Sequence, residues 1–255
     1  MCFIRVTKSS RPKTMVLQSL SSCQSGEVTH AGPGRPRLHA PRRPGPTARA
    51  EILDAAAELF TTRGFSPTST RSIAEAVGIR QASLYNHFAT KNDILVALLE
   101  GTVEPTLDFD DHLDDTLPPE VRLCALAWFD TVQLCAGRWN LGALYHLPEA
   151  RTEPFDRFRD ERRQLMERYR RLAARIVGDG DPRTHLPFRI VESVIGIRAD
   201  NADIDAGLSE ALATASLTVL GVGDVAAVTS VARALVVGVP DDLVGSMAPP
   251  SPPHA

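Results

Sequence analysis

Residues 68–95, TSTRSIAEAVGIRQASLYNHFATKNDIL, constrain the fold of this chain more than any other stretch. Ser69 can accept hydrogen bonds from the free N–H groups of a helix that begins just after it. Gly78 can end this helix, because glycine takes a positive φ without Cβ strain. A second helix is predicted immediately after this glycine turn. Two short helices joined in this way are typical of a helix-turn-helix motif.

The second helix of the motif, predicted over 81–88, has one face that packs and one that is free. Leu84 and Phe88 are four residues apart and therefore share a face. Tyr85 points elsewhere, and a large aromatic residue is seldom exposed on a helix unless it contacts something. A third helix begins at Thr90, where Lys91 adds a positive charge beside free N–H groups, a combination that suits a phosphate. The stretch therefore predicts a DNA-reading head.

The same residues resemble the tetracycline-repressor (TetR) family of bacterial transcription regulators. The resemblance covers residues 52–95, and it is carried by Ile52, Leu53, Ala56, Leu59, Phe60, Gly64, Phe65, Ile73, Ala74, Gly78, Leu84, Tyr85, His87, Phe88, Lys91 and Leu95. Carried over position by position, it implies that the residues facing DNA are Thr70, Arg71, Gln81, Ala82, Ser83, Tyr85, His87 and Lys91. Arg80 stands where the family often has a small polar residue. A cap for the recognition helix therefore does not follow from the resemblance, and Arg80 is itself a candidate phosphate contact.

The remaining sequence predicts an all-α protein with two domains. A first helix over 47–63 carries an apolar stripe that can pack on the motif, and a helix over 91–103, ended or bent by Pro105, braces this small head. An acidic segment follows at 108–115. Further helices are predicted over 118–136, 141–146, 153–177, 188–197, 206–220 and 224–237. The last two are apolar on more than one face, and the resemblance implies that two such late helices from each subunit form a four-helix dimer interface.

These elements define four segments. Residues 1–46 are predicted to be a disordered basic arm, 47–93 a helix-turn-helix DNA-binding domain, 94–240 a helical ligand-binding and dimerisation domain, and 241–255 a disordered tail. The net charge of −3 conceals this division: the arm has eight basic residues against one acid, the head has five of each sign, and the remainder has fifteen against twenty-five. Arg42 and Arg43 of the arm can follow the DNA backbone or enter a minor groove. The alternative is that much of the arm is a dispensable extension.

Aromatic residues make up only 5% of the chain but gather in its middle third. Such a cluster can line an apolar ligand pocket between helices, or it can simply fill the core. The candidate ligand-binding residues are Trp128, Phe129, Trp139, Tyr145, His146, Phe158 and Tyr169. Arginines between Arg157 and Arg175 alternate with acids at helical spacing, which indicates a solvated face rather than a second nucleic-acid surface.

Several classes of function find no support in the sequence. No apolar run approaches the roughly 20 residues that cross a bilayer, and no signal peptide is evident, so a cytoplasmic protein is expected. The four cysteines, Cys2, Cys23, Cys124 and Cys135, form no CxxC pair, so buried thiols are favoured over a metal site, a disulfide framework or a redox sensor. No catalytic or dinucleotide motif is present, and neither an enzyme nor a cofactor is predicted.

The function predicted from these features is that of a homodimeric transcription regulator. Its partners are expected to be double-stranded DNA with a palindromic operator and a small apolar or amphipathic effector that releases the DNA. Gln81 is expected to read an adenine edge, Arg71 a guanine, and Tyr85 a thymine methyl group or a phosphate. The alternatives are a ligand-independent architectural DNA-binding protein, which the near-neutral head disfavours, and a small-molecule-binding or catalytic helical protein.

Overall fold

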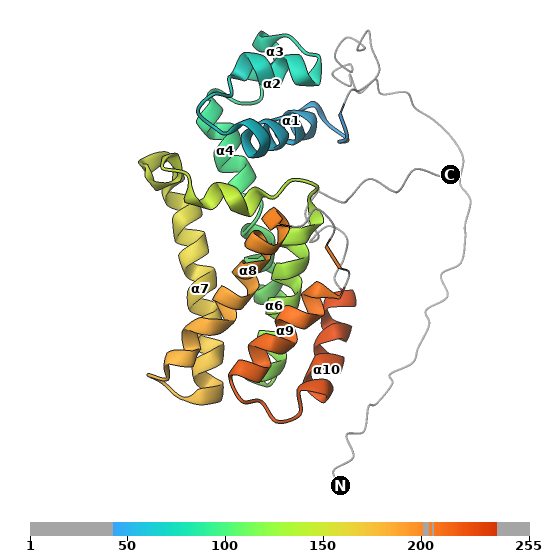
Figure 1. Ribbon diagram of the computed structural model, residues 1–255, viewed down its shortest axis with the longest axis vertical. Coiled ribbons are helices and arrows are strands. Elements are labelled where there is room, and N and C mark those ends of the chain that lie inside the picture. Colours follow the sequence, from blue (N-terminus) through green and yellow to red (C-terminus); the bar gives the residue numbers. More distant parts are fainter. Residues whose placement is uncertain (1–42, 201–203, 206, 239–255) are drawn as a thin grey trace, which may run out of the picture. The chain divides into compact units, whose positions relative to one another are not determined.

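The computed structural model describes residues 43–200, 204–205 and 207–238, and these residues are helical, without strands. The predicted arm, except for residues 43–46, and the predicted tail lie outside them. The described elements are α1 (Ala48–Arg63), α2 (Thr70–Val77), α3 (Gln81–Tyr85), α4 (Lys91–Glu100), α5 (Glu104–His112), α6 (Pro119–Ala136), η1 (Leu141–His146), η2 (Glu149–Arg151), η3 (Glu153–Phe155), α7 (Asp156–Val177), η4 (Pro182–His185), α8 (Leu186–Asp200), α9 (Leu208–Val219) and α10 (Val225–Val237), where η denotes a 3₁₀ helix (Figure 1). The predicted all-α fold is confirmed.

Local capping groups set the beginnings of the head helices. Thr47 accepts a hydrogen bond from the N–H of Ala50, and Ser69 and Thr90 each form a reciprocal capping box with the residue three positions later. Gly78 ends α2 at φ 80°, in the left-handed region where glycine has no Cβ penalty. Arg80 precedes α3 without a side-chain cap. The head is therefore assembled as its sequence predicts.

Several helix ends differ from the predicted ones by two or three residues; α3, for example, ends at Tyr85 rather than at residue 88. The α4–α5 junction is the place where the difference has a clear cause. The brace helix α4 ends at Glu100 rather than near residue 103. Pro105 does not end it but occupies the first turn of α5, where a missing N–H costs least. The acidic segment predicted at 108–115 is helical up to His112. Asp110 can be buried there because Arg122 donates to its Oδ1 at 2.9 Å and Arg168 donates to its Oδ2 at 3.0 Å.

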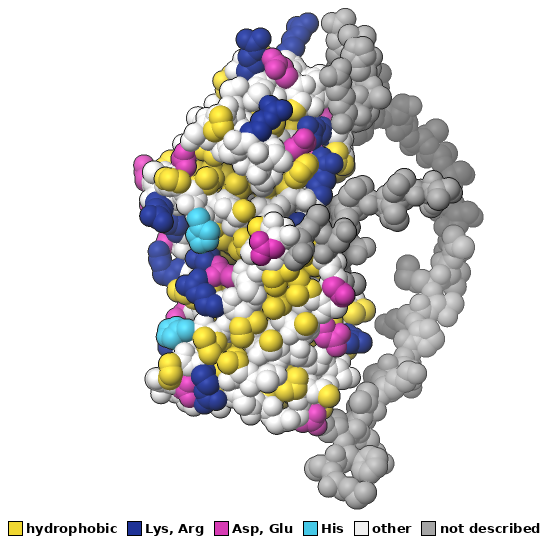
Figure 2. Space-filling view, viewed as in Figure 1, with side chains coloured by type: hydrophobic (Ala, Val, Ile, Leu, Met, Phe, Trp, Pro, Cys, Tyr) yellow, Lys and Arg dark blue, Asp and Glu magenta, His cyan; other side chains and the backbone are white. Residues whose placement is uncertain are grey.

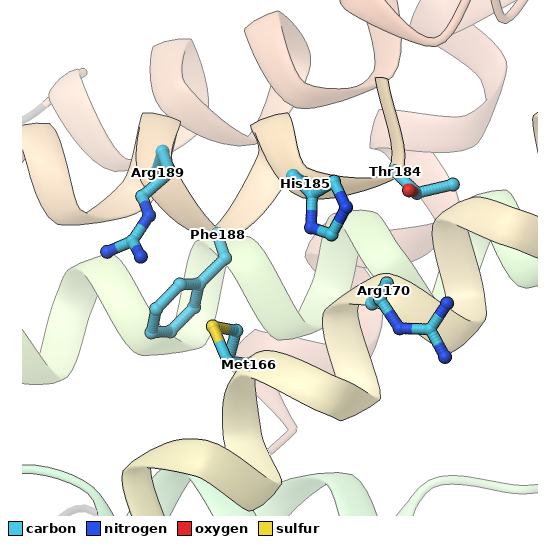
Figure 3. Close-up of a pocket in the computed structure, with 6 residues that line it drawn as sticks. All are labelled: Met166, Arg170, Thr184, His185, Phe188 and Arg189. Atoms are coloured by element: carbon cyan, nitrogen blue, oxygen red, sulfur yellow. The ribbon is translucent and has the colours of Figure 1, made fainter. Parts of the chain in front are cut away.

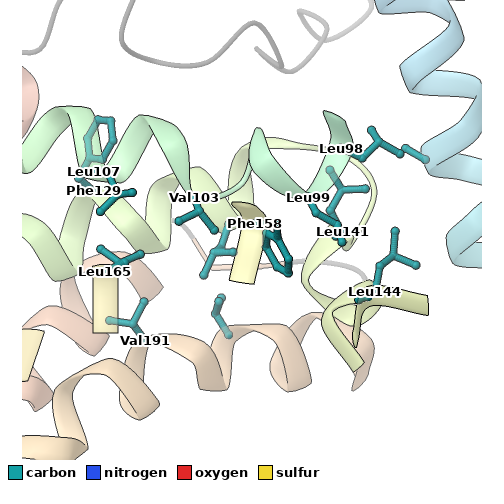
Figure 4. Close-up of a cluster of buried hydrophobic side chains, with 14 of the residues drawn as sticks. Leu98, Leu99, Val103, Leu107, Phe129, Leu141, Leu144, Phe158, Leu165 and Val191 are labelled. Carbon is teal, nitrogen blue, oxygen red and sulfur yellow. The ribbon is translucent and has the colours of Figure 1, made fainter. Parts of the chain in front are cut away.

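The apolar core is continuous from the head, residues 47–93, into the larger helical body, which comprises the described residues from 94 onward. Figure 4 shows its central part, where Leu98 and Leu99 of α4 lie near Leu141 and Leu144 of η1, and Phe158 of α7 lies in the same cluster. In the body, α6 packs against α7, α8, α9 and α10. The carbonyl groups of Leu134 and Gly137 at the end of α6 accept hydrogen bonds from Arg198 of α8. The brace helix α4 thus contributes side chains to this core in both the head and the body, as predicted.

The described part of the chain contains no helix with both the length and the apolar character needed to cross a membrane. Apolar side chains are instead exposed over α8 and α9 on the face drawn in Figure 2. On α9 and α10 the exposed apolar residues are mostly small, and they are Ala211, Ala215, Ala226, Ala227, Val231, Ala234 and Val237. Each of these two helices therefore has one exposed apolar face and an opposite face that contacts α6.

Candidate nucleic-acid interface

The helix α3 has a buried face and an exposed face, as its sequence predicts. Leu84 is fully buried, and Phe88, just after the helix, is 5% exposed. Tyr85 is 47% exposed, which makes it one of the few large apolar side chains at the surface of the described residues. The other exposed residues of the predicted DNA surface in this region are Arg80, Gln81, Ala82, Ser83 and His87. The head therefore presents a compact polar surface with an aromatic ring in it.

Three of these predicted contact residues form a hydrogen-bonded cluster. The Nε2 of Gln81 donates to the Oγ1 of Thr70 at 3.0 Å and to the hydroxyl oxygen of Tyr85 at 3.3 Å. The two hydroxyl groups are 3.1 Å apart and share a third hydrogen bond. Because Thr70 begins α2 and the other two residues belong to α3, this cluster joins the two helices of the motif at their exposed ends.

Arg71 is highly exposed on α2 and has one described partner. Its Nε donates to Glu75 at 2.9 Å, and both side chains are more than half exposed, at 77% and 65%. An exposed pair of this kind contributes only about 0.3–0.5 kcal/mol, so binding to DNA can replace it at small cost. Arg71 therefore remains available as a base or phosphate contact.

Lys91 has a structural environment that its sequence position did not reveal. Its ammonium group donates to the carbonyl oxygens of Phe65 and Thr68, both at 2.8 Å, and lies 4.1 Å from the centre of the Phe65 ring. Partial burial lowers the pKa of Lys91, and the nearby Glu149 carboxylate opposes this shift. The ammonium thus fastens the turn between α1 and α2 to α4. Its predicted phosphate contact remains a prediction, and it would compete with these carbonyl groups.

Arg43 of the predicted arm lies against the head in the structure, and its predicted contact with DNA remains a prediction. Its guanidinium group forms ion pairs with Glu58 and, at 3.3 Å, with Asp54 of α1, and it donates to the carbonyl oxygen of Ala76 at 3.4 Å. These contacts leave its side chain only 15% exposed, so a contact with DNA would have to replace them. Arg42 lies outside the described residues.

Polar contacts also connect the head to the segment between α6 and η2. Asp54 of α1 accepts hydrogen bonds from Arg138 at 2.7 and 3.1 Å and from the indole N–H of Trp139 at 3.2 Å. Ser66, in the turn after α1, donates to Glu149 of η2 at 3.0 Å. The segment 138–149 therefore holds the head at two points besides the brace helix.

This connecting segment is also fixed against the body. Gly142 of η1 lies so close to α8 that a Cβ atom there would be 2.6 Å from the Ile195 side chain. The hydroxyl groups of Tyr145 and Thr102 are 2.6 Å apart, and the Tyr145 ring centre is 5.3 Å from that of Phe158. Burial raises the pKa of Tyr145. η1 therefore contacts the body directly, and the segment that contains it also contacts the head.

The aromatic residues predicted to line a pocket have diverse surroundings. Phe129 stacks on Phe109 with ring centres 4.2 Å apart, and Phe158 and Tyr169 are buried. Trp128 and Trp139 are half-buried, whereas His146 is exposed. The structure therefore does not bring all seven residues together around one space. Phe129, Phe158 and Tyr169 fill the core, and their predicted contact with a ligand remains a prediction.

A hollow of about 200 Å³ lies elsewhere, between α7 and the η4–α8 corner. Figure 3 shows Phe188 and Met166, two of its lining residues, side by side, with Arg170 and Arg189 directed away from each other. Both guanidinium groups already have carboxylate partners, since Arg170 pairs with Glu167 and Arg189 with Glu192. None of the predicted ligand-binding residues lines it.

The body also contains a buried carboxylate that the sequence pattern did not single out. Asp130 of α6 is 3% exposed and accepts hydrogen bonds from the hydroxyl groups of Tyr169 at 3.0 Å and Thr106 at 3.3 Å. Burial raises the pKa of Asp130 to about 7, although both hydrogen bonds act to lower it. Burial and the Asp130 carboxylate in turn raise the pKa of Tyr169 well above its ordinary value. The available signal was a lone acid inside the apolar stretch of residues 121–136.

The described cysteines are free thiols. Cys124 is buried, and burial raises its pKa to about 11, while Cys135 is half-buried. Raised pKa values disfavour the reactive thiolate. Within the described ranges, no group of three or more His, Cys, Asp and Glu residues is placed to hold a metal ion.

Comparison with known proteins agrees with this architecture. Residues 52–98 match the family model described as bacterial regulatory proteins, tetR family. The crystal structure of Mycobacterium smegmatis AmtR is 53% identical, with a TM-score of 0.73, and the match covers 76% of this chain and 97% of that one. The structure of the ketosteroid transcriptional regulator KstR2 of Mycobacterium tuberculosis, at 23% identity and a TM-score of 0.56, shares the fold; the match covers 70% of this chain and 95% of that one.

Similarity to curated relatives is concentrated in the head. The HTH-type transcriptional repressor KstR2 of Mycobacterium tuberculosis is 38% identical over 88 residues, which are 33% of this chain and 44% of the relative. The chain thus matches less than half the length of this relative. The high identity to AmtR, by contrast, extends over nearly all of that structure. The helix-turn-helix head, its helical body and these matches together establish that the chain belongs to the TetR family of DNA-binding transcription regulators.

Proposed function

We propose that this protein is a cytoplasmic, homodimeric repressor that binds a palindromic operator and is released from it by a small amphipathic effector. Residues 47–93 would bind DNA, and residues 94–240 would bind the effector and form the dimer. The observation that supports DNA reading most directly is the division of α3, where Leu84 is fully buried and the neighbouring Tyr85 is 47% exposed. An aromatic ring held out from a small rigid head is suited to a groove of DNA.

The proposed base and phosphate contacts follow from this exposed surface. Gln81 and Arg71 have the amide and guanidinium groups that recognise base edges in the major groove. Tyr85 would contact a thymine methyl group or a phosphate. Arg80 and His87 lie at the two ends of α3 and would contact the backbone.

Dimer formation is proposed through α9 and α10. Small exposed residues such as Ala211, Ala215 and Ala227 allow helices of two subunits to approach closely, and Val231 is 50% exposed in the same region. A two-fold dimer would place its recognition helices about 34–36 Å apart, or a multiple of this distance, and would therefore require an inverted repeat.

Release by an effector is proposed to act through the connecting segment 138–149. Tyr145 of this segment lies between Thr102 and Phe158 in the body, while Arg138 and Trp139 of the same segment hold Asp54 in the head. A ligand that displaces the Tyr145 ring would move both ends of the segment. The Tyr145 hydroxyl group and its Thr102 partner lie beside the Phe158 ring, a combination that suits a ligand with a polar part as well as an apolar one.

Selection of bound DNA from a random pool, by the purified protein at near-physiological salt, tests this proposal. An enriched inverted repeat would support a dimeric sequence reader and would supply a probe for effector screening. Absence of any enriched sequence would contradict the reading function and favour the architectural alternative, which should show a large salt dependence instead. An effector found in the screen must lower the affinity for the selected repeat; a ligand that binds the body without this effect would contradict the release mechanism.

A further inference from the structure

The hydrogen-bonded cluster of Thr70, Gln81 and Tyr85 limits what the Gln81 side chain can offer to a base. Three contacts join its members: Gln81 to Thr70 at 3.0 Å, Gln81 to Tyr85 at 3.3 Å, and the two hydroxyl oxygens to each other at 3.1 Å. A side-chain amide has two very different ends, since its nitrogen carries two hydrogens and its oxygen carries none. The orientation of this amide therefore decides which end faces DNA.

Counting hydrogens settles the orientation. With the nitrogen towards the hydroxyl groups, its two N–H groups supply two contacts and one hydroxyl hydrogen supplies the third. With the oxygen in that place, both hydroxyl hydrogens would be used on it, and the two hydroxyl oxygens would face each other without a hydrogen between them. Only the first arrangement gives all three contacts a hydrogen, and it leaves the Oε1 of Gln81 facing away from Thr70 and Tyr85.

This free oxygen lies where a base can reach it. Gln81 is the first residue of α3 and is exposed, and residues at the start of a recognition helix contact base edges. No described residue donates a hydrogen bond to its Oε1. In the major groove, adenine N6 and cytosine N4 are donors, whereas guanine and thymine present acceptors at the corresponding edge.

We propose that Gln81 reads its base through the carbonyl oxygen alone, because Thr70 and Tyr85 hold its nitrogen. It therefore accepts adenine or cytosine and rejects guanine and thymine. A free glutamine amide would behave differently, since it pairs with both N6 and N7 of adenine and so distinguishes adenine from cytosine. Thr70 and Tyr85 thus act as positioning residues that broaden the recognised sequence. This inference rests on the proposed function, in which α3 reads an operator.

The first part of the test uses the wild-type protein. The operator selected from a random pool is changed one base pair at a time, and the affinity of each variant is measured for the wild type and for Gln81→Ala. The position whose preference disappears in Gln81→Ala is the one that Gln81 reads. At this position the wild type should bind adenine and cytosine within about threefold of each other, and guanine and thymine about tenfold more weakly. Asn86→Ala, an exposed change at the end of the same helix, outside both the cluster and the predicted DNA contacts, is the matched control.

The second part frees the amide. The double variant Thr70→Val, Tyr85→Phe removes both hydroxyl groups but keeps the side-chain shapes, and the Gln81 nitrogen then becomes available to adenine N7. At the position identified above, this variant should prefer adenine over cytosine by about tenfold. Unchanged thermal unfolding of the double variant would show that its head is intact, and the wild-type measurement stands even if it is not.

The possible results distinguish a failure of the oxygen-only reading by Gln81 from a failure of the proposed function. A wild-type preference of tenfold for adenine over cytosine, or for guanine or thymine, would overturn the oxygen-only reading, as would an operator profile that Gln81→Ala leaves unchanged. Each of these results still requires a selected operator and so leaves the proposed function intact. Failure of the wild type to select any sequence would overturn the proposed function and this inference together.

Discussion

Replacing Asp130 with asparagine should raise the stability of the protein at neutral and alkaline pH. Asp130 is 3% exposed, and its described hydrogen-bond donors are two neutral hydroxyl groups, those of Tyr169 and Thr106. Burial raises its pKa from 3.8 to about 7, so the folded protein retains a proton there that the unfolded chain has already lost. Ionisation of this group therefore works against the folded state.

The size and sign of the effect follow from the linkage between proton binding at Asp130 and folding. Between about pH 4 and pH 7 the folded state binds more protons at Asp130 than the unfolded state, so the free energy of unfolding falls as the pH rises and levels off above pH 7. At about 1.36 kcal/mol for each pKa unit, the full loss is at most about 4 kcal/mol. Asparagine keeps the shape and can pair with both hydroxyl groups. We expect Asp130→Asn to exceed the wild type by about 1–3 kcal/mol at pH 8, and the gain to vanish near pH 4.

Urea denaturation at one protein concentration, repeated at several pH values from 4 to 8, measures this difference. Other titrating groups are common to both proteins, so subtraction isolates Asp130. Asp108→Asn, which removes an exposed carboxylate on α5, is the matched control and should leave the pH profile of stability unchanged. A constant difference between Asp130→Asn and the wild type across this range would refute the reasoning, because it would show that the folded and unfolded states bind protons equally at Asp130.

Three further variants test the head and its attachment. Tyr85→Ala should weaken binding to the selected operator by about 1–3 kcal/mol without lowering the unfolding temperature; a matching loss of stability would mean that the ring is part of the core. Lys91→Met keeps the apolar stem but removes the donor to the Phe65 and Thr68 carbonyl groups, so it should cost about 1–3 kcal/mol in urea denaturation; unchanged stability together with a shallower salt dependence of DNA binding would instead assign Lys91 to phosphate. Asp54→Ala should make the region around Trp139 exchange amide hydrogens faster, since it removes the acceptor of Arg138 and Trp139, and unchanged exchange would exclude this attachment.

The head was predictable because its signals are local. Ser69, Gly78 and Thr90 act on backbone groups within four residues of themselves, and the structure has each of them in the predicted role. The same reasoning failed at Pro105, since proline is favoured both after a helix and in the first turn of one. Choosing between these places required knowing that Thr106 and Phe109 would be buried against the body.

The predicted site was limited by contacts between elements distant in sequence. Periodicity placed Tyr85 on the free face of α3, but it could not show that Thr70 and Gln81 bond to it. The charge of Lys91 suggested a phosphate, whereas carbonyl groups more than twenty residues earlier occupy its ammonium. Asp130 stands alone among mostly apolar residues in the sequence, which favours burial, but only packing reveals the Tyr169 and Thr106 hydroxyl groups that bond to it.

The attachment of the head supports the proposed release mechanism, in which the position of the head responds to the body. The brace helix α4 is continuous with the head core, and a rigid helix of this kind transmits a rotation without bending. The head is also held at Asp54 by Arg138 and Trp139 and at Ser66 by Glu149, so segment 138–149 and α4 must move together or these contacts must break. Arg138 is 42% exposed and Ser66 is exposed, so water can replace these partners at low cost. Two arrangements of the head that differ by a few such contacts would therefore be close in free energy, which is the condition under which a small ligand in the body can select between them.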